Sequence, residues 1–342
     1  MHPPSFAPGK RTSHDPSRGR ICHGPGGGFA RVLCALAIGA GGATAARAET
    51  LTVFAAGTLG KTFTTLARGF EKVHPGVTVQ PQFGGSVKMV KQVTVLHQPA
   101  DLVAVADYSV IPKYMFKGDE GHRPTANWSI GFLGNAITFI YTPKSKGAKG
   151  IDANNWWHVL SEPGVQIGRS NPDTDPSGYQ TLQMLALASL YYKQPDLDAR
   201  VLANAPKSNI RDTETDLISA LELGQIDYLA IYRSDAVQHH MQSLDLPPQI
   251  NLSDPRFAAE YAKAEAHTTN GVLPGKPIVY ALTIPTSAPH AELAREFAAY
   301  VLGPAGQKVI ADNGFIPMKQ PYAMNRENVP PGLRELTTAW PQ

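Results

Sequence analysis

The chain has little cysteine, and none of it lies in the part that has the character of a folded protein. Only two of the 342 residues are cysteines, Cys22 and Cys34, and both precede residue 49. From residue 49 on, the chain therefore has no disulfide and no thiol chemistry. Its core alone must hold the fold together.

The first 48 residues lack the periodicity of a domain and have the composition of a secretory signal. A basic, Pro- and Ser-rich head leads through a short apolar stretch to the small-x-small exit Ala46-Arg47-Ala48. The apolar stretch is too short and too rich in Gly and Ala to span a bilayer. We expect residues 1–48 to be a cleaved leader and the mature protein to be exported, to the periplasm.

A basic surface is also missing. Residues 1–48 hold six of the 31 Lys and Arg and one of the 28 Asp and Glu, which leaves 25 basic and 27 acidic residues in the mature chain. The slightly acidic mature protein has no charge pattern typical of nucleic-acid binding. We expect a monomer with no nucleic-acid partner.

Motifs of common enzymes are absent as well. The sequence contains no G-x-S-x-G elbow, no H-E-x-x-H and no P-loop. His239 and His240 are adjacent and would not share a face of a helix or strand, so we interpret them as surface histidines rather than metal ligands. We predict neither catalysis nor a cofactor nor a resident metal.

What the sequence does contain is an alternation of strands and helices. Apolar runs at 50–54, 77–83 and 101–106 predict strands, and the first is followed by an amphipathic helix whose apolar face runs from Leu59 to Phe70. This βαβαβ order predicts a parallel sheet covered by helices on both faces. The fold class is therefore α/β.

The remaining pattern predicts two lobes joined by two crossing segments. Two β-rich runs, "AITFIYTP" and "PIVYALTIP", enclose a second set of strands and helices. Lobe 1 would comprise residues 49–137 plus 285–342, and lobe 2 residues 142–278. A cleft between two such lobes is a common place for a small ligand.

Three loops with small or hydroxyl residues occur where a strand leads into a helix. They are "AAGT" (55–58), "GGS" (84–86) and "SNPDTDPSGY" (170–179). Ligands in open α/β sheets collect beyond the carboxyl ends of the strands, and helix N-termini offer unpaired N–H groups to an anion. Glycines such as Gly57 and Gly85 would let the backbone approach a ligand closely.

The hydroxyl groups of these loops favour a tetrahedral oxyanion, because Thr58, Ser86 and Ser177 add neutral donors. Each loop also has an ordinary interpretation. Thr58 and Ser86 are candidate N-cap residues. Asp175 followed by Pro176 is typical of a helix start that needs no ligand.

Three charged residues allow structural interpretations. Arg233 would either face the cleft as an anion partner or form a structural ion pair. Asp101 and Asp107 flank a buried strand, and we expect them to cap or turn the chain rather than to catalyse.

Several segments together resemble the tungstate/molybdate-binding proteins of ABC importers, which have the type II periplasmic binding fold. The most specific are "ADYSVIP", "SNPDTDPSGY" and "YRS", and the likeness covers essentially all of residues 50–320. The resemblance implies a clamshell that closes on one oxyanion and presents it to a membrane permease. It places oxyanion contacts on the Thr58 loop, Ser86, the turn Asp175–Ser177 and the strand that ends at Tyr232.

In the branch that this chain resembles, two carboxylates approach the metal atom of the oxyanion. The first matches Asp175, and the second is a glutamate immediately before "YRS", where this chain has Ile231. Six-coordination by two carboxylates therefore cannot form from the matching positions. Gln180 stands where the family usually has a basic residue, which removes a positive charge near the turn.

A lone acid next to a dianion costs several kcal/mol, whereas it accepts the proton of an anion such as hydrogen phosphate. The sequence thus predicts a solute-binding protein for molybdate or tungstate, with phosphate or another oxyanion as the alternative. An exported hydrolase of phosphorylated or sulfated substrates and a ligand-sensing module are two further alternatives.

Overall fold

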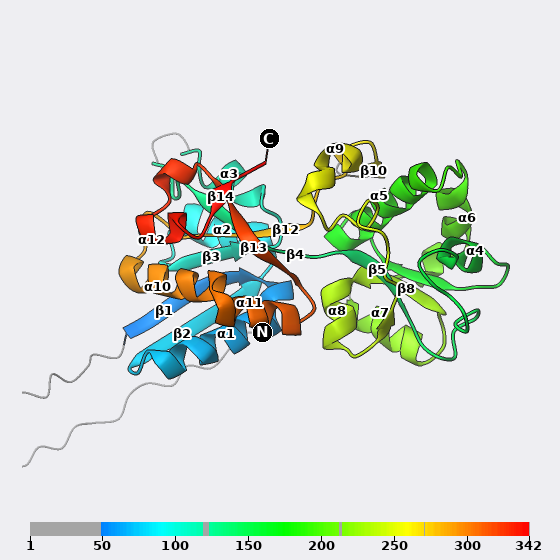
Figure 1. Ribbon diagram of the computed structural model, residues 1–342, viewed down its shortest axis with the longest axis horizontal. Coiled ribbons are helices and arrows are strands. Elements are labelled where there is room, and N and C mark those ends of the chain that lie inside the picture. Colours follow the sequence, from blue (N-terminus) through cyan, green and yellow to red (C-terminus); the bar gives the residue numbers. More distant parts are fainter. Residues whose placement is uncertain (1–48, 119–122, 212–213, 270, 342) are drawn as a thin grey trace, which may run out of the picture. The chain divides into compact units, whose positions relative to one another are not determined.

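The computed structural model describes residues 49–118, 123–211, 214–269 and 271–341 (Figure 1). The predicted leader, residues 1–48, lies outside the described residues. Within these ranges, every helix is too short or too polar to cross a membrane.

A seven-stranded sheet organises what we call the first lobe, with the strand order β14-β13-β4-β12-β3-β1-β2 (Figure 1). Its strands are β1 (Glu49–Ala56), β2 (Val77–Gly84), β3 (Leu102–Val105), β4 (Ser129–Gly134), β12 (Val279–Thr283), β13 (Ile316–Met324) and β14 (Thr338–Ala339). β1 is parallel to β2 and to β3, which confirms the predicted βαβαβ start. β12 runs antiparallel to both β3 and β4, so the whole sheet is mixed rather than parallel.

Helices cover both faces of this sheet, as predicted. They are α1 (Gly60–Val73), α2 (Ser86–Thr94), α3 (Val110–Tyr114), α10 (Ala291–Leu302), α11 (Pro304–Asp312) and α12 (Pro331–Arg334). Side chains along β1 alternate between the two faces, as the two-residue period of a strand requires. Leu51 and Val53 join the cluster that contains Phe63 and Phe70 of α1, whereas Phe54 packs with Val90 of α2.

A five-stranded sheet organises the second lobe, with the strand order β7-β6-β8-β5-β9. Its strands are β5 (Ile137–Tyr141), β6 (Ile167–Ser170), β7 (Ile210–Arg211), β8 (Tyr228–Tyr232) and β9 (Gln242–Ser243). Its helices are α4 (Trp156–Leu160), α5 (Pro176–Tyr191), α6 (Leu197–Ala203), α7 (Glu214–Glu222) and α8 (Arg233–Gln238). The helix α9 (Ala258–Tyr261) and the hairpin of β10 (Glu265–Thr268) with β11 (Gly271–Pro274) precede the return to β12. The 3-10 turns are η1 (Gly57–Leu59), η2 (Lys207–Asn209), η3 (Pro255–Phe257) and η4 (Arg326–Asn328).

The chain changes sheets twice. The lobe boundaries predicted from the sequence are 49–137 plus 285–342 for the first lobe and 142–278 for the second. They assign residues 138–141 and 279–284 to neither lobe. Pairing assigns 137–141 to the five-stranded sheet and 279–283 to the seven-stranded sheet. The first crossing, from β4 to β5, is short, whereas the return from β9 to β12 runs through α9 and the β10–β11 hairpin.

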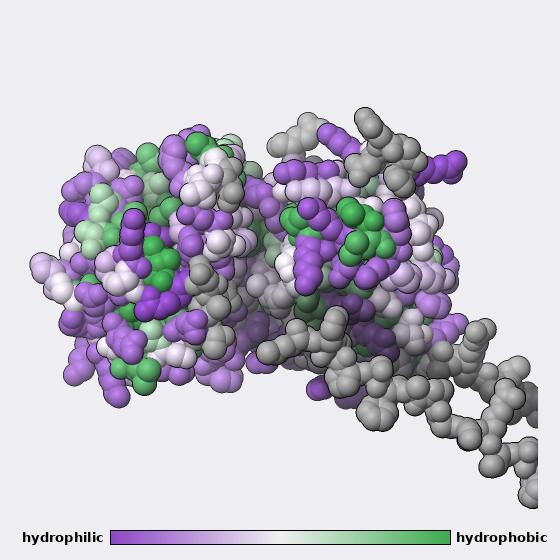
Figure 2. Space-filling view, turned by 180° about the vertical axis from the view of Figure 1, so that it is seen from behind, coloured by the Kyte–Doolittle hydropathy of each residue, from purple (hydrophilic) through white to green (hydrophobic). Residues whose placement is uncertain are grey.

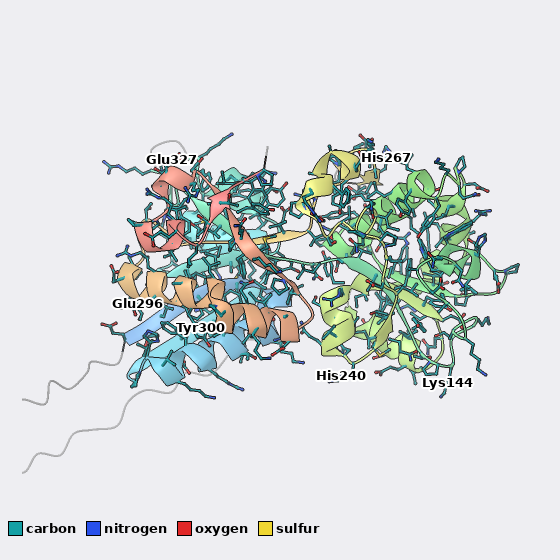
Figure 3. The ribbon with its side chains drawn as sticks, in the orientation of Figure 1. Lys144, His240, His267, Glu296, Tyr300 and Glu327 are labelled. Carbon is teal, nitrogen blue, oxygen red and sulfur yellow. The ribbon has the colours of Figure 1, made fainter. Side chains whose placement is uncertain are left out.

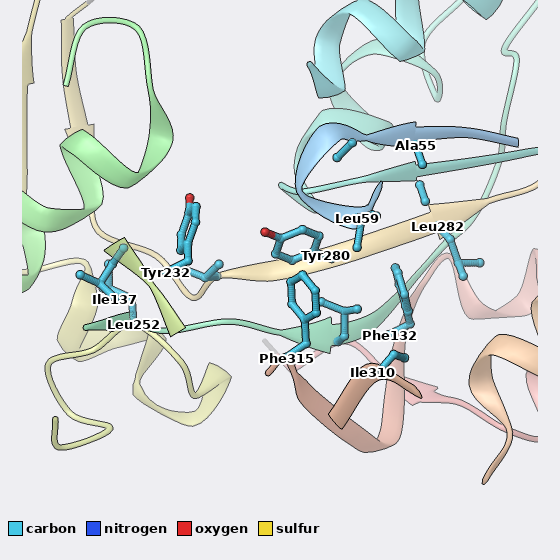
Figure 4. Packing of buried hydrophobic residues seen from close by; sticks show 14 of the residues in the cluster. Ala55, Leu59, Phe132, Ile137, Tyr232, Leu252, Tyr280, Leu282, Ile310 and Phe315 are labelled. Atoms are coloured by element: carbon cyan, nitrogen blue, oxygen red, sulfur yellow. The ribbon is translucent and has the colours of Figure 1, made fainter. Parts of the chain in front are cut away.

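One apolar cluster contains residues from both sheets (Figure 4). Leu59 and Tyr280 belong to it from the first lobe, and Tyr232 from the second. The rings of Tyr280 and Phe315 meet edge to face at 5.3 Å. Trp156 is also fully buried in this cluster. This continuous core stabilises the fold of residues 49–342, which contain no cysteine.

The surface is mainly polar on the face that Figure 2 shows, with apolar patches separated by hydrophilic residues. The most exposed large apolar side chains are Leu223 (74%), Val73 (62%) and Leu96 (61%). These three lie at or just beyond the ends of α7, α1 and α2. Apolar exposure is therefore scattered over different elements.

Candidate functional site

Two of the three predicted loops lie side by side at the carboxyl end of the first sheet. The parallel register pairs Ala56 of β1 with Gly84 of β2, the last residue of each strand. Gly57 and Thr58 therefore leave the sheet next to Gly85 and Ser86. Adjacent parallel strands that end together, each followed by a helical turn, are a typical place for a ligand.

Open space lies beside both loop glycines. A Cβ built on Gly57 or on Gly85 would have no atom within 4 Å. Both glycines are also exposed, so a small ligand can approach the backbone at these positions, which a larger side chain would hinder.

The hydroxyl groups of Thr58 and Ser86 do not cap helices, so the N-cap interpretation is wrong for both. The N-cap residues of α1 and α2 are Leu59 and Gly85, and neither helix has a side-chain cap bond. Thr58 Oγ1 is buried without a hydrogen-bond partner among the described residues. Ser86 Oγ accepts a hydrogen bond from the Ala106 N–H over 3.0 Å, and its own hydrogen stays available.

The third loop does begin a helix in the ordinary way, as predicted. Asp175 caps α5, and Pro176 occupies the first turn. Asp175 Oδ1 accepts hydrogen bonds from the N–H of Ser177 (2.7 Å) and from its hydroxyl (2.8 Å). Both donors of Ser177 thus serve the cap in this structure, and their role toward an anion stays a prediction.

Close packing fixes where α5 begins. A Cβ on Gly178 would lie 2.7 Å from the backbone of Asn171 and of Pro172. Any other residue would push the first turn of α5 away from the loop after β6. Gly178 thereby holds the Asp175 carboxyl in place.

The end of β8 is bonded to α5. The Tyr232 hydroxyl donates to Gln180 Oε1 over 2.8 Å, and both side chains are buried. Gln180, which replaces a basic residue of the resembled family, is therefore a neutral partner of the tyrosine. This bond sets the position of β8 against the turn that holds Asp175.

Ile231 lies on the other face of β8. Its side chain is buried in an apolar cluster with Leu217 of α7 and Leu229, whereas Tyr232 belongs to the cluster that contains α5 residues. Successive strand residues point to opposite faces, so a glutamate at position 231 would enter the α7 side of the core. In this chain, position 231 therefore does not mark the place of a second carboxylate.

The charge of Asp175 acts on a second carboxyl group, which was not among the candidates from the sequence. Asp235 is in the first turn of α8, three residues after Tyr232. Burial, together with the charge of Asp175, raises the pKa of Asp235 from 3.8 to about 7. Asp235 Oδ2 is buried and has no hydrogen-bond partner among the described residues. Acids are common in first turns, so the sequence carries no signal that would have singled out Asp235.

The pKa of one tyrosine responds to acids of both lobes. Burial raises the pKa of Tyr179 on α5 above its usual range, and the charges of Asp107 and Asp175 raise it further. Asp107 follows β3, where its Oδ1 accepts hydrogen bonds from Ser109 and its Oδ2 accepts one from Lys276 Nζ at 2.6 Å. The turn-forming role predicted for Asp107 is confirmed.

Two other candidates have structural roles. Asp101 accepts hydrogen bonds from the N–H groups of Thr52 and His290, so it has a structural role as expected, although it joins distant segments rather than turning the chain locally. The guanidinium of Arg233 donates to the Gly314 carbonyl oxygen over 2.6 Å. Arg233 thereby ties α8 to the turn before β13.

The histidine pair lies on the surface, as predicted. His239 and His240 are both exposed, and Figure 3 shows His240 at the outside of the second lobe. Within the described ranges, no three His, Cys, Asp or Glu side chains form a metal site. Two cavities, of about 270 and 650 Å³, are lined by residues other than those of the three loops.

Comparison with known proteins agrees with this architecture. Residues 51–316 match the model of a family described as bacterial extracellular solute-binding protein. The chain is 37% identical to an uncharacterized solute-binding protein of Petrotoga mobilis, over 83% of this chain and 89% of that protein. It is 34% identical to the molybdate/tungstate-binding protein WtpA of Thermococcus kodakarensis, over 87% and 92% of the two chains.

A solved structure has the same fold. The periplasmic molybdate-binding protein of Azotobacter vinelandii matches with a TM-score of 0.53 and 20% identity, over 78% of this chain and 99% of that one. This likeness confirms the two-lobed α/β fold of periplasmic binding proteins. With its family model and its relatives in agreement, the chain belongs to the bacterial extracellular solute-binding proteins.

Proposed function

We propose that this protein is the solute-binding component of an ABC importer and that it captures molybdate or tungstate. It is exported with the loss of residues 1–48 and acts as a monomer without catalysis. The two lobes close around one oxyanion, and the closed form delivers it to the permease. Relatives whose names state molybdate/tungstate binding support this choice of ligand.

The observation that carries the proposal is the pair of loops at the ends of β1 and β2. The buried, unpartnered hydroxyl of Thr58 is a donor without an acceptor, which is costly unless a ligand or water supplies one. In the same turns, a Cβ on Gly57 or on Gly85 would meet no atom within 4 Å, and both glycines are exposed. A tetrahedral oxyanion with four acceptor oxygens fits donors arranged in this way.

The second lobe would supply the other contacts. The turn Asp175–Ser177 and the end of β8 at Tyr232 face the anion from that side in this proposal. Asp175 would either approach the metal atom of the oxyanion or accept a proton from the anion. Neutral dipoles and hydroxyls, rather than cations, would do most of the binding.

Phosphate is a second candidate, because the Asp175 turn offers a carboxylate that can accept the proton of hydrogen phosphate. Fully ionised sulfate has no such proton, and an ionised carboxylate would repel it. Sulfate is therefore the matched control for both candidates.

Titration of the purified protein without residues 1–48 tests the function. Molybdate, tungstate, phosphate and sulfate are each added in a calorimeter, and metals carried through purification are measured by mass spectrometry. We expect saturable 1:1 binding of molybdate and tungstate and bound molybdenum or tungsten in the purified protein. Tight binding of phosphate alone would favour the second candidate, and binding of none of the four would contradict both.

A further inference from the structure

The turn that holds Asp175 is bonded to a segment far along the chain. Asp173 Oδ1 accepts a hydrogen bond from the Thr269 N–H over 2.7 Å, across 96 residues of sequence. Thr269 directly follows β10 and lies in the turn of the β10–β11 hairpin. The hairpin therefore contacts the loop that leads into α5, two residues before Asp175.

The base of the hairpin is fixed to the second lobe by other contacts. Gln183 Nε2 on α5 donates to the Leu273 carbonyl oxygen over 2.9 Å, and the Gly275 N–H donates to the Ala264 carbonyl oxygen over 2.7 Å. Figure 1 shows β10 beside α5, which it contacts. Because the hairpin is held at its base and paired along its length, the N–H group in its turn has a defined position.

The loop around Asp173 is a compact unit. Asn171 Oδ1 accepts a hydrogen bond from the Asp173 N–H over 3.1 Å. The Asn171 carbonyl oxygen accepts two more, from the N–H groups of Thr174 (3.2 Å) and Asp175 (2.9 Å). A displacement of Asp173 would disturb these short-range bonds, so the contact with the hairpin also constrains Asp175.

We propose that Asp173 is a positioning residue of the oxyanion site, whose carboxylate is held by the Thr269 N–H and keeps the Asp175 turn in its binding arrangement. This inference rests on the proposed function. Asp173 acts through the turn and does not contact the anion. Its negative charge would oppose the approach of a dianion, so its contribution to binding lies in the hydrogen bond that it accepts. Substitutions can separate the hydrogen bond from the charge.

The experiment compares two substitutions of Asp173 by calorimetric titration with molybdate. Asp173→Ala removes both the acceptor and the charge, and its Kd should rise about tenfold because the turn loses its tie to the hairpin. Asp173→Asn removes the charge but keeps an acceptor oxygen for the Thr269 N–H. It should bind molybdate at least as tightly as wild type. Charge alone would make both variants bind more tightly, so the two effects have opposite signs in Asp173→Ala.

Two substitutions of Thr269 test the other partner of the bond. Thr269→Pro removes the N–H donor and should weaken molybdate binding about as much as Asp173→Ala does. Thr269→Ala is the matched control, since it changes the side chain but keeps the N–H, and it should bind like wild type. These variants leave Asp173 in place, so they answer the question even if Asp173→Ala does not fold.

Hydrogen exchange of the ligand-free proteins, followed by mass spectrometry, gives a readout that does not depend on binding. In Asp173→Ala, amides of the loop 171–176 should exchange faster than in wild type, whereas those of β11 should keep their rates. Faster exchange throughout the chain would instead indicate general destabilisation and would contradict a local positioning role.

Two outcomes overturn the inference alone: Asp173→Ala binds molybdate as tightly as wild type or more tightly, or Asp173→Asn loses as much affinity as Asp173→Ala. A wild-type protein that binds none of the oxyanions overturns the proposed function. The two failures are therefore distinguishable.

Discussion

Ser86 Oγ accepts a hydrogen bond from the N–H of Ala106 over 3.0 Å, and so ties the turn after β2 to the end of β3. Thr58 follows β1, which lies between β2 and β3 in the sheet. Its hydroxyl is buried and has no hydrogen-bond partner in the described structure. One hydroxyl thus serves the fold and the other does not, although both stand at the same end of the same sheet.

This difference predicts opposite responses to substitution. Thr58→Val keeps the shape and removes only an unsatisfied hydroxyl, so the free protein should be as stable as wild type or slightly more so. Its affinity for the oxyanion should fall roughly tenfold or more, because a hydrogen bond to a charged group contributes at least about 1.5 kcal/mol. Thermal unfolding of the free protein and calorimetric titration measure the two effects.

Ser86→Ala is the companion variant. It leaves the buried N–H of Ala106 without its acceptor, so it should cost about 1–3 kcal/mol of stability in addition to affinity. Equal loss of stability in both variants would show that Thr58 has a structural partner and would contradict its assignment as a ligand donor.

The open space at the loop glycines leads to a second prediction. Gly85→Val should fold with nearly unchanged stability, because a Cβ there meets no atom within 4 Å. The branched side chain would fill the place of the anion, and binding should weaken at least about a hundredfold, the equivalent of losing about 3 kcal/mol. Gly178→Ala is the contrasting control and should destabilise the free protein, since its Cβ would lie 2.7 Å from backbone atoms. Wild-type affinity in Gly85→Val would place the anion elsewhere.

Ile231→Glu tests which face of β8 belongs to the site. The glutamate would enter the apolar cluster of Leu217 and Leu229, so we expect a loss of several kcal/mol of stability and no gain in tungstate affinity. Urea unfolding measures the first effect and titration the second. Ile231→Val controls for packing and should cost about 1 kcal/mol. Tighter tungstate binding by a stable Ile231→Glu protein would refute the placement of this side chain.

The pKa of Asp235 predicts a pH dependence of the free protein. Folding raises this pKa from 3.8 to about 7, so between these pH values the folded chain binds more protons than the unfolded chain. The contribution of Asp235 to stability is therefore fully present below pH 4 and is lost as the pH rises through 7, by at most about 4 kcal/mol.

Comparison with Asp235→Asn isolates this contribution, because the other carboxyl groups are the same in both proteins. The free energy of unfolding is measured in urea at pH 5 and pH 8. Between pH 5 and pH 8, the wild type should lose more stability than the variant does. Identical pH profiles for the two proteins would mean that Asp235 ionises normally.

Much of the fold follows from local pattern. The strand 50–54 and the helix after it were predictable because their apolar residues recur with periods of two and of about 3.6. The antiparallel insertion of β12 between β3 and β4 was not predictable, because it depends on where the returning chain finds a free sheet edge. Periodicity identifies a strand but does not identify its neighbours.

The site was predictable only in part, for the same reason. Strand-to-helix loops with glycine and hydroxyl residues identified Thr58 and Ser86 as candidates. The commitment of Ser177 to the Asp175 cap and the burial of the Asp235 Oδ2 atom depend on the folded structure, which sequence spacing does not show. The position before Tyr232 was likewise interpreted as a site position from its place in the sequence alone. Because successive strand residues point to opposite faces, the Ile231 side chain lies in the apolar core instead.

The location of a bound tungsten atom tests the central claim most directly. Crystals of the protein grown with tungstate are measured at the tungsten absorption edge, where anomalous scattering identifies the metal without assumptions about the protein. We expect one strong peak per chain, with oxyanion oxygens within hydrogen-bond distance of Thr58 Oγ1 and Ser86 Oγ. A tungsten peak away from these two hydroxyls would contradict the assignment of this site.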